Sequence, residues 1–304
     1  MLSLEVIYQA AERIAAYTHR TPILSSSSLD QLFGKRLFLK AEHLQKTGSF
    51  KARGAVNAAL QLERPRGLLT VSSGNHAQAV AYAAYILKVP ALIVMPEDAS
   101  RFKKAGTRAY GAEVYDRGVT VENREEVAHT LTLETGYSFI HPFNDPRVMA
   151  GQGTIALELA AQVPDLDAVL VAVGGGGMIS GVAAAMKALA PQVRVIGVEP
   201  EVANDAQQSL AAGRRIALEQ APKTVADGVR TLSLGEYPWE VIRERVDEIV
   251  SVPEEAILEA QRLLMSRTKQ VVEPTGALPL APLLTGHPLP ERLGIVVCGG
   301  NWMP

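Results

Sequence analysis

The chain has 304 residues, of which 47% are hydrophobic and 20% are charged, and its formal net charge is −2. This composition is typical of a globular protein, and so small a net charge provides no basic field for nucleic acid or for an anionic membrane. The chain contains one cysteine, Cys298, so no intramolecular disulfide can form. No apolar run reaches the roughly 20 residues that a membrane span requires. We therefore expect a soluble cytoplasmic protein without nucleic-acid or membrane partners.

Predicted strands and helices alternate along the chain. Residues 1–17 carry charged side chains within an apolar pattern, which predicts an amphipathic helix and argues against a signal peptide. Strand-like runs followed by helical patterns then occupy residues 68–88, 91–110 and 168–190, and further strands are predicted at 194–200 and 295–300. This alternation predicts the α/β class, with parallel sheets covered by helices. Ligands of such sheets bind beyond the carboxyl ends of the strands.

The grouping of the strands predicts two lobes. Residues 67–144 form one small domain in this interpretation. Residues 1–66 and 145–304 together form a larger domain, so the chain crosses between the lobes twice.

The segment KTGSFKARGA, residues 46–55, leads into a predicted helix. Gly48 and Ser49 are good helix-start residues, which places Lys51 in the first turn. The positive end of a helix disfavours an ammonium group, so a lysine here is poorly placed for the helix alone. A solvated surface lysine is the ordinary interpretation. The alternative is a neutral amine that forms a Schiff base.

The segment VSSGNHAQA, residues 71–79, joins a strand to a helix. Backbone amides at that helix start, together with the side chains of Ser72 and Asn75, would form a cradle for a carboxylate. A plain helix N-cap is the alternative interpretation. The histidines are scattered singly, so His76 is not predicted to bind a metal.

Four consecutive glycines, Gly174 to Gly177, follow a buried strand and precede a helix. Such a loop lets backbone N–H groups approach a phosphate closely. Glu199 follows about 20 residues later, as in dinucleotide-binding folds, but Ile179 or Ser180 occupies the third glycine position of that fingerprint. The fingerprint is thus only partly matched, and a nicotinamide-dependent oxidoreductase is an alternative interpretation. A non-catalytic binding protein is a further alternative.

Together with CGGN at 298–301, these motifs resemble, in this order, the fold-type II pyridoxal 5'-phosphate (PLP) enzymes. Within that group they resemble the serine racemase and threonine or serine dehydratase family. The resemblance covers nearly the whole chain and includes HPFNDP, AGQGTIALE, TVADGV and VEPTGA. It implies two lobes, each an open and mostly parallel sheet flanked by helices, as in the tryptophan synthase β fold.

The resemblance also implies roles for matching positions. Lys51 would hold PLP covalently and would remove the substrate α-proton. The other cofactor contacts would be Phe50 beside the ring, Asn75 at the ring 3'-oxygen, Cys298 at the pyridine nitrogen, and Gly174, Gly175, Gly176, Gly177 and Met178 around the phosphate. The substrate carboxylate would lie against Ser72, Ser73, Asn75 and His76.

The same resemblance implies a divalent-cation site, a homodimer and a nucleotide effector. Glu199, the Ala203 carbonyl and Asp205 match the divalent-cation site of serine racemase, and oxygen ligands suit Mg²⁺ or Ca²⁺. A solvated acidic turn is the alternative interpretation of these residues. Relatives are homodimers, and some that keep a pair like Lys46 and Thr47 are activated by a nucleotide.

The implied reaction is the β-elimination of water from L-threonine or L-serine, which yields 2-oxobutanoate or pyruvate and ammonia. Ser73 matches the serine that gives serine racemase an acid on the second face of the substrate. Racemization is therefore expected as a side activity, and a serine racemase is the alternative. Phe143 replaces the asparagine of the racemase and resembles the dehydratases, so these two residues point in opposite directions.

Overall fold

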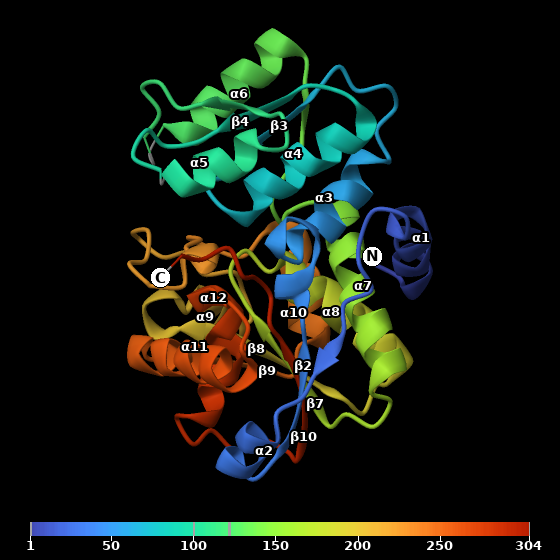
Figure 1. The fold of residues 1–304 in the computed structure, drawn as a ribbon, viewed down its shortest axis with the longest axis vertical. Coiled ribbons are helices and arrows are strands. Elements are labelled where there is room, and N and C mark those ends of the chain that lie inside the picture. The colour runs from blue at the N-terminus through green and yellow to red at the C-terminus, as the bar shows by residue number, and fades with distance from the viewer. Residues whose placement is uncertain (1, 100, 121–122, 304) are drawn as a thin grey trace.

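The computed structural model describes residues 2–99, 101–120 and 123–303, and its strands form two separate sheets (Figure 1). The larger sheet has six strands, of which only β1 runs antiparallel to its neighbour β2. Its strands in spatial order are β1 (Ile23–Leu24), β2 (Arg36–Lys40), β10 (Arg292–Val296), β7 (Ala168–Ala172), β8 (Arg194–Pro200) and β9 (Glu248–Val252). The predicted α/β class is confirmed.

The smaller sheet has four strands, and all of them are parallel. In spatial order they are β5 (Glu113–Tyr115), β4 (Ala91–Val94), β3 (Leu68–Val71) and β6 (Ser138–Phe139). Strands β3 and β4 are buried along their whole length. Such continuous burial is typical of parallel strands with both faces covered.

Helices cover both sheets (Figure 1). Those nearest the smaller sheet are α4 (Asn75–Leu87), α5 (Arg101–Arg108) and α6 (Arg124–Thr135). The others are α1 (Leu4–Ile14), α2 (Ser27–Phe33), α3 (Lys51–Ala59), α7 (Pro146–Gln162), α8 (Gly177–Leu189), α9 (Asp205–Ala212), α10 (Glu236–Arg245), α11 (Glu254–Thr268) and α12 (Pro274–Ala277). Within the described ranges, no helix is both long enough and apolar enough to span a bilayer.

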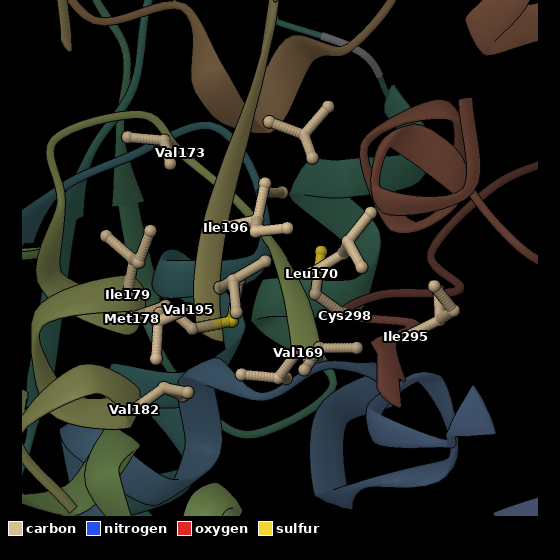
Figure 2. Packing of buried hydrophobic residues seen from close by; sticks show 14 of the residues in the cluster. Val169, Leu170, Val173, Met178, Ile179, Val182, Val195, Ile196, Ile295 and Cys298 are labelled. Atoms are coloured by element: carbon tan, nitrogen blue, oxygen red, sulfur yellow. The ribbon is translucent and has the colours of Figure 1, made fainter. Parts of the chain in front are cut away.

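The larger sheet encloses the main hydrophobic core. Val169, Leu170, Val195 and Ile196 are inaccessible to solvent, and Figure 2 shows them with side chains of α8 and with Cys298. Full burial of an aliphatic side chain contributes about 1.5–3 kcal/mol. This packed layer gives the loops at the carboxyl ends of the strands a rigid base.

The strands of the smaller sheet all lie within residues 67–144, and those of the larger sheet lie outside this range. We propose that the two lobes divide at these positions. Helix α3 precedes the small lobe in sequence, but its Val56 shares a core cluster with Val80 of α4. Any movement of the small lobe would therefore be transmitted to α3.

A buried ion network anchors α3. The guanidinium of Arg53, which is 1% exposed, forms two hydrogen bonds of 2.8 Å to the carboxylate of Glu42. It also donates to Glu158, which in turn pairs with Lys40 at 2.7 Å. Two cations and two carboxylates compensate one another here, and removal of one partner from such a buried group typically costs about 3–5 kcal/mol. The network therefore fixes the turn that follows Lys51.

Candidate active site

Lys51 is the first residue of α3, and Gly48 and Ser49 lie in the turn before it. The N–H of Phe50 donates to the Cys298 carbonyl at 3.1 Å, which ties the helix start to the loop after β10. The Lys51 ammonium donates to the Pro142 carbonyl at 2.8 Å and lies 5.2 Å from the Phe50 ring centroid. Burial lowers the pKa of Lys51 to about 8. A substantial neutral fraction, which a nucleophile or base requires, is thus present near neutral pH.

The imidazoles close to Lys51 are neutral. His76 donates from Nε2 to the Ile140 carbonyl at 3.0 Å, and Nδ1 of His141 accepts from the backbone of Phe143 and Asn144. Burial foremost, and then the charge of Lys51, lower the pKa of His76 to about 3 and that of His141 to about 4. Neither histidine carries a positive charge at neutral pH, so neither adds a second cation beside Lys51.

The predicted carboxylate cradle lies at the start of α4. The helix begins at Asn75 and follows the turn of Ser72, Ser73 and Gly74. No side chain caps this end, and apart from the Ala77 N–H, which donates to the Gly74 carbonyl at 3.1 Å, the N–H groups of its first turn are available to bind an anion. The Gly74 N–H donates to Ser72 Oγ at 3.2 Å, which holds the turn in shape. The segment therefore presents backbone amides and two hydroxyls together.

The tetraglycine loop opens α8, as the sequence predicts. Gly176 has a φ of 89°, a left-handed conformation that favours glycine. A Cβ at Gly175 would lie 2.3 Å from the Phe143 ring, and one at Gly177 would lie 2.9 Å from the Phe143 backbone. Glycine is thus required at Gly175 and Gly177 because Phe143 packs closely against the loop. The absence of side chains also leaves the backbone accessible at the uncapped start of α8. Phe143 joins this loop to the segment that contacts Lys51.

Cys298 and Met178 border the same region. Cys298 is 1% exposed, and its thiol donates to the Thr275 carbonyl at 3.4 Å. Burial foremost raises the pKa of this thiol well above its usual value, so the group stays neutral. Met178 is buried as the second residue of α8. Figure 2 shows both sulfur-containing side chains packed among the aliphatic residues of the main core.

Two polar residues that the sequence did not single out, Glu273 and Asn301, lie against Asn75. The Asn75 Nδ2 donates to Glu273 Oε1 at 2.6 Å, and its Oδ1 accepts from Asn301 Nδ2 at 2.8 Å. Burial foremost, and then the charge of Asp227, raise the pKa of Glu273 to about 7. Glu273 could have been noticed in the sequence because it is an acidic residue in the motif VEPTGA, between an apolar position and a proline.

Glu199 and Asp205 form a separate acidic pair beyond β8. The two oxygens of Glu199 accept the backbone N–H groups of Ala206 and Gln207 at 3.1 and 2.9 Å, so this carboxylate caps α9. Asp205 is 1% exposed, and its Oδ2 has no hydrogen-bond partner among the described residues. Burial raises the pKa of both carboxyls, to about 7 for Asp205. The described ranges hold no cluster of three His, Cys, Asp or Glu side chains fit for a metal, so a cation here would need carbonyl or water ligands as well.

Comparison with known proteins agrees with this geometry. The structure matches that of a threonine deaminase from T.th. with a TM-score of 0.97 and 63% identity, over 99% of this chain and 100% of that chain. A curated L-threo-3-hydroxyaspartate ammonia-lyase of Pseudomonas sp is 46% identical over 302 residues, which are 97% of this chain and 94% of the relative. A serine racemase of Oryza sativa subsp. indica is 44% identical over 305 residues, 97% of this chain and 89% of the relative.

The family described as pyridoxal-phosphate dependent enzyme matches residues 14–299. The matched region contains Lys51, the cradle before α4, the tetraglycine loop and Cys298. It includes all strands of both sheets. The chain therefore belongs to the pyridoxal-phosphate dependent enzyme family, in its fold-type II branch.

Proposed function

We propose that the protein eliminates water from L-threonine, and also from L-serine, with PLP bound covalently to Lys51. The observation that carries this proposal is the position of the half-buried Lys51 at the start of α3, where its amine contacts the Pro142 carbonyl and desolvation lowers its pKa to about 8. The family assignment supports PLP and withdraws support from a nicotinamide-dependent oxidoreductase. The relatives include an L-threo-3-hydroxyaspartate ammonia-lyase and a threonine deaminase, and this supports carbon–nitrogen lyase chemistry.

The residues present fit the cofactor. The backbone of Gly174 to Gly177 at the uncapped start of α8 would hold the phosphate, with Met178 beside it. Phe50 would flank the ring, Asn75 would donate to the ring oxygen, and the neutral thiol of Cys298 would face the ring nitrogen. When bound, PLP supplies a conjugated ring that delocalises the electron pair left by α-proton removal.

The protein groups then have separate tasks. The cradle of Ser72, Ser73, Asn75 and His76 would hold the substrate carboxylate by backbone amides and hydroxyls. The Lys51 amine would take the α-proton, and the bond from the β-carbon to its hydroxyl would break with loss of water. Addition of water and release of ammonia complete the balance, so threonine yields 2-oxobutanoate and ammonia.

Product analysis tests this function. We expect L-threonine to release ammonia and 2-oxobutanoate in equal amounts, and L-serine to release ammonia and pyruvate, with slower formation of D-serine. L-threo-3-hydroxyaspartate should also be tested as a substrate, because an L-threo-3-hydroxyaspartate ammonia-lyase is 46% identical to this chain. Formation of D-serine faster than ammonia from L-serine would instead assign the protein as mainly a serine racemase. Preferential deamination of hydroxyaspartate would overturn the substrate assignment alone.

A serine racemase is the second candidate, and Ser73 favours it. This residue lies in the turn before α4 and is partly exposed, so its hydroxyl is not enclosed in the core. A hydroxyl on the face opposite Lys51 would return a proton to that face. Phe143 supports elimination by resemblance, because it replaces the asparagine of the racemase and resembles the dehydratases. We propose racemization as a side activity.

We further propose a Mg²⁺ or Ca²⁺ site at Glu199, Asp205 and the Ala203 carbonyl. The unpartnered Oδ2 of buried Asp205 and the adjacent Glu199 carboxylate fit a hard cation with oxygen ligands. We expect Mg²⁺ or Ca²⁺ to raise the Tm of the chelator-treated enzyme by several degrees, because a ligand of the folded state stabilises it. Asp205→Asn should abolish this response, whereas Asp165→Asn, at a carboxylate that is 66% exposed, should retain it. A Tm that does not change on addition of either cation would refute the proposed site.

We also propose that the protein is a homodimer and that it binds a nucleotide effector. The family resemblance supports a homodimer. A nucleotide effector near Lys46 and Thr47 finds support in the strained backbone of Thr47, which has a φ of 61°, unusual for a β-branched residue. The buried Oγ1 of Thr47 has no hydrogen-bond partner among the described residues.

A further inference from the structure

Glu273 is a buried carboxylate that the proposed reaction leaves unused. It is the residue just before α12, yet its side chain makes no capping bond to that helix. It is 4% exposed, and its Oε1 instead accepts the 2.6 Å hydrogen bond from Asn75. A buried carboxylate is costly unless it is hydrogen-bonded or paired, and the described contacts of this one are directed at the candidate site.

The backbone beside Glu273 leaves room for this contact. A Cβ at Gly299 would lie 2.0 Å from Glu273 Oε1 and 3.0 Å from Asn75 Nδ2. Gly299 follows Cys298 in the loop after β10. The absence of a side chain at this position is therefore a condition for the pairing of Glu273 with Asn75.

The partners of Asn75 determine which way its amide is turned. Glu273 offers an acceptor on one side, and Asn301 Nδ2 offers a donor on the other at 2.8 Å. Asn301 is itself oriented, because the same Nδ2 donates to the Thr47 carbonyl at 2.8 Å. An ionised carboxylate can only accept hydrogen bonds, so it must face the NH₂ end of Asn75. One N–H of Asn75 is left for another acceptor.

We propose that Glu273 is a positioning residue, which fixes the Asn75 amide so that its second N–H points to the ring oxygen of bound PLP. The proposal rests on the proposed function, because it requires that Asn75 contacts the cofactor. Burial and Asp227 raise the pKa of Glu273 to about 7, while the Asn75 hydrogen bond and Lys103 oppose this rise. The accepting form of Glu273 is therefore populated at neutral pH and prevails above it.

Glu273→Gln tests the proposal, because glutamine keeps the shape but offers both a donor and an acceptor. Asn75 can then face it with either end. We expect the dissociation constant of PLP to rise roughly tenfold, as for the loss of one hydrogen bond to a charged group. The visible absorbance band of the lysine-bound cofactor should shift, because the ring oxygen loses its donor. Glu273→Asp should weaken PLP binding similarly, because the shorter chain cannot span the distance to Asn75.

A double-mutant cycle separates positioning from a general structural effect. In an Asn75→Ala background, we expect Glu273→Gln to change PLP affinity by no more than about twofold, since its effect acts through Asn75. Glu248→Gln is the matched control. Glu248 pairs with Arg194 at the amino end of β9, away from the ligand-binding ends of the strands, and its change should leave affinity and band unaltered.

Two results would overturn the proposal. One is wild-type affinity and an unshifted band in both Glu273 variants. The other is an equal loss of affinity with and without the Asn75 side chain. Failure of the proposed function is distinguishable, because the wild-type protein would then show no lysine-bound cofactor band or no ammonia release.

Discussion

Lys51→Ala is expected to abolish ammonia release from L-threonine, with a loss of at least about a thousandfold. In the proposed function, the substitution removes both the covalent attachment of PLP and the base that takes the α-proton, and base catalysis alone contributes about 10²–10⁴-fold. The visible band of the lysine-bound cofactor should disappear as well. The two effects are measured by an ammonia assay under saturating threonine and by absorbance of the reconstituted protein.

Lys223→Ala is the matched control for this change. Lys223 is exposed, and its truncation should leave turnover and absorbance within about twofold of wild type, as for most surface substitutions. The Tm of the Lys51 variant without cofactor should stay close to that of the wild type, because the lost hydrogen bond to the Pro142 carbonyl is offset by the removal of a partly desolvated amine. Turnover retained in Lys51→Ala would refute the central proposal.

Ser73→Ala is expected to remove racemization and to spare elimination. The loss of a positioned acid should lower D-serine formation at least about a hundredfold, because general acid catalysis contributes that much or more. Elimination needs one base, Lys51, so pyruvate formation from L-serine should stay within a few-fold of wild type. Chiral separation of serine and a pyruvate assay on the same sample give the two rates.

Ser72→Ala provides the contrast. Its hydroxyl holds the turn before α4 through the Gly74 N–H, so the substitution should weaken carboxylate binding and raise KM for both reactions. The two serines are adjacent, so a general disturbance of the turn would affect both variants alike. Equal losses of racemization and elimination in Ser73→Ala would contradict the assigned role.

The local pattern of the sequence determined much of this fold and site. Alternation of apolar strands with helical segments predicted parallel sheets, because the hydrophobic periodicities of strands and helices can be recognised in short windows of sequence. The tetraglycine run and the Ser72 to His76 turn were also predictable, because strand ends in such sheets lead to helix starts with free backbone N–H groups. The family resemblance then predicted a role for each matching position.

The contacts between distant residues depend on long-range packing. Asn75 and Glu273 are 198 positions apart, and Arg53 and Glu158 are 105 apart, so no local pattern connects them. The pKa shifts of Lys51, His76 and Glu273 likewise depend on burial by several distant segments, which the sequence does not encode locally. Local sequence patterns were sufficient to predict the α/β class and the loops at the strand ends. Long-range packing decided the protonation state and orientation of the groups within it, because both depend on neighbours that come together only when the sheets are assembled.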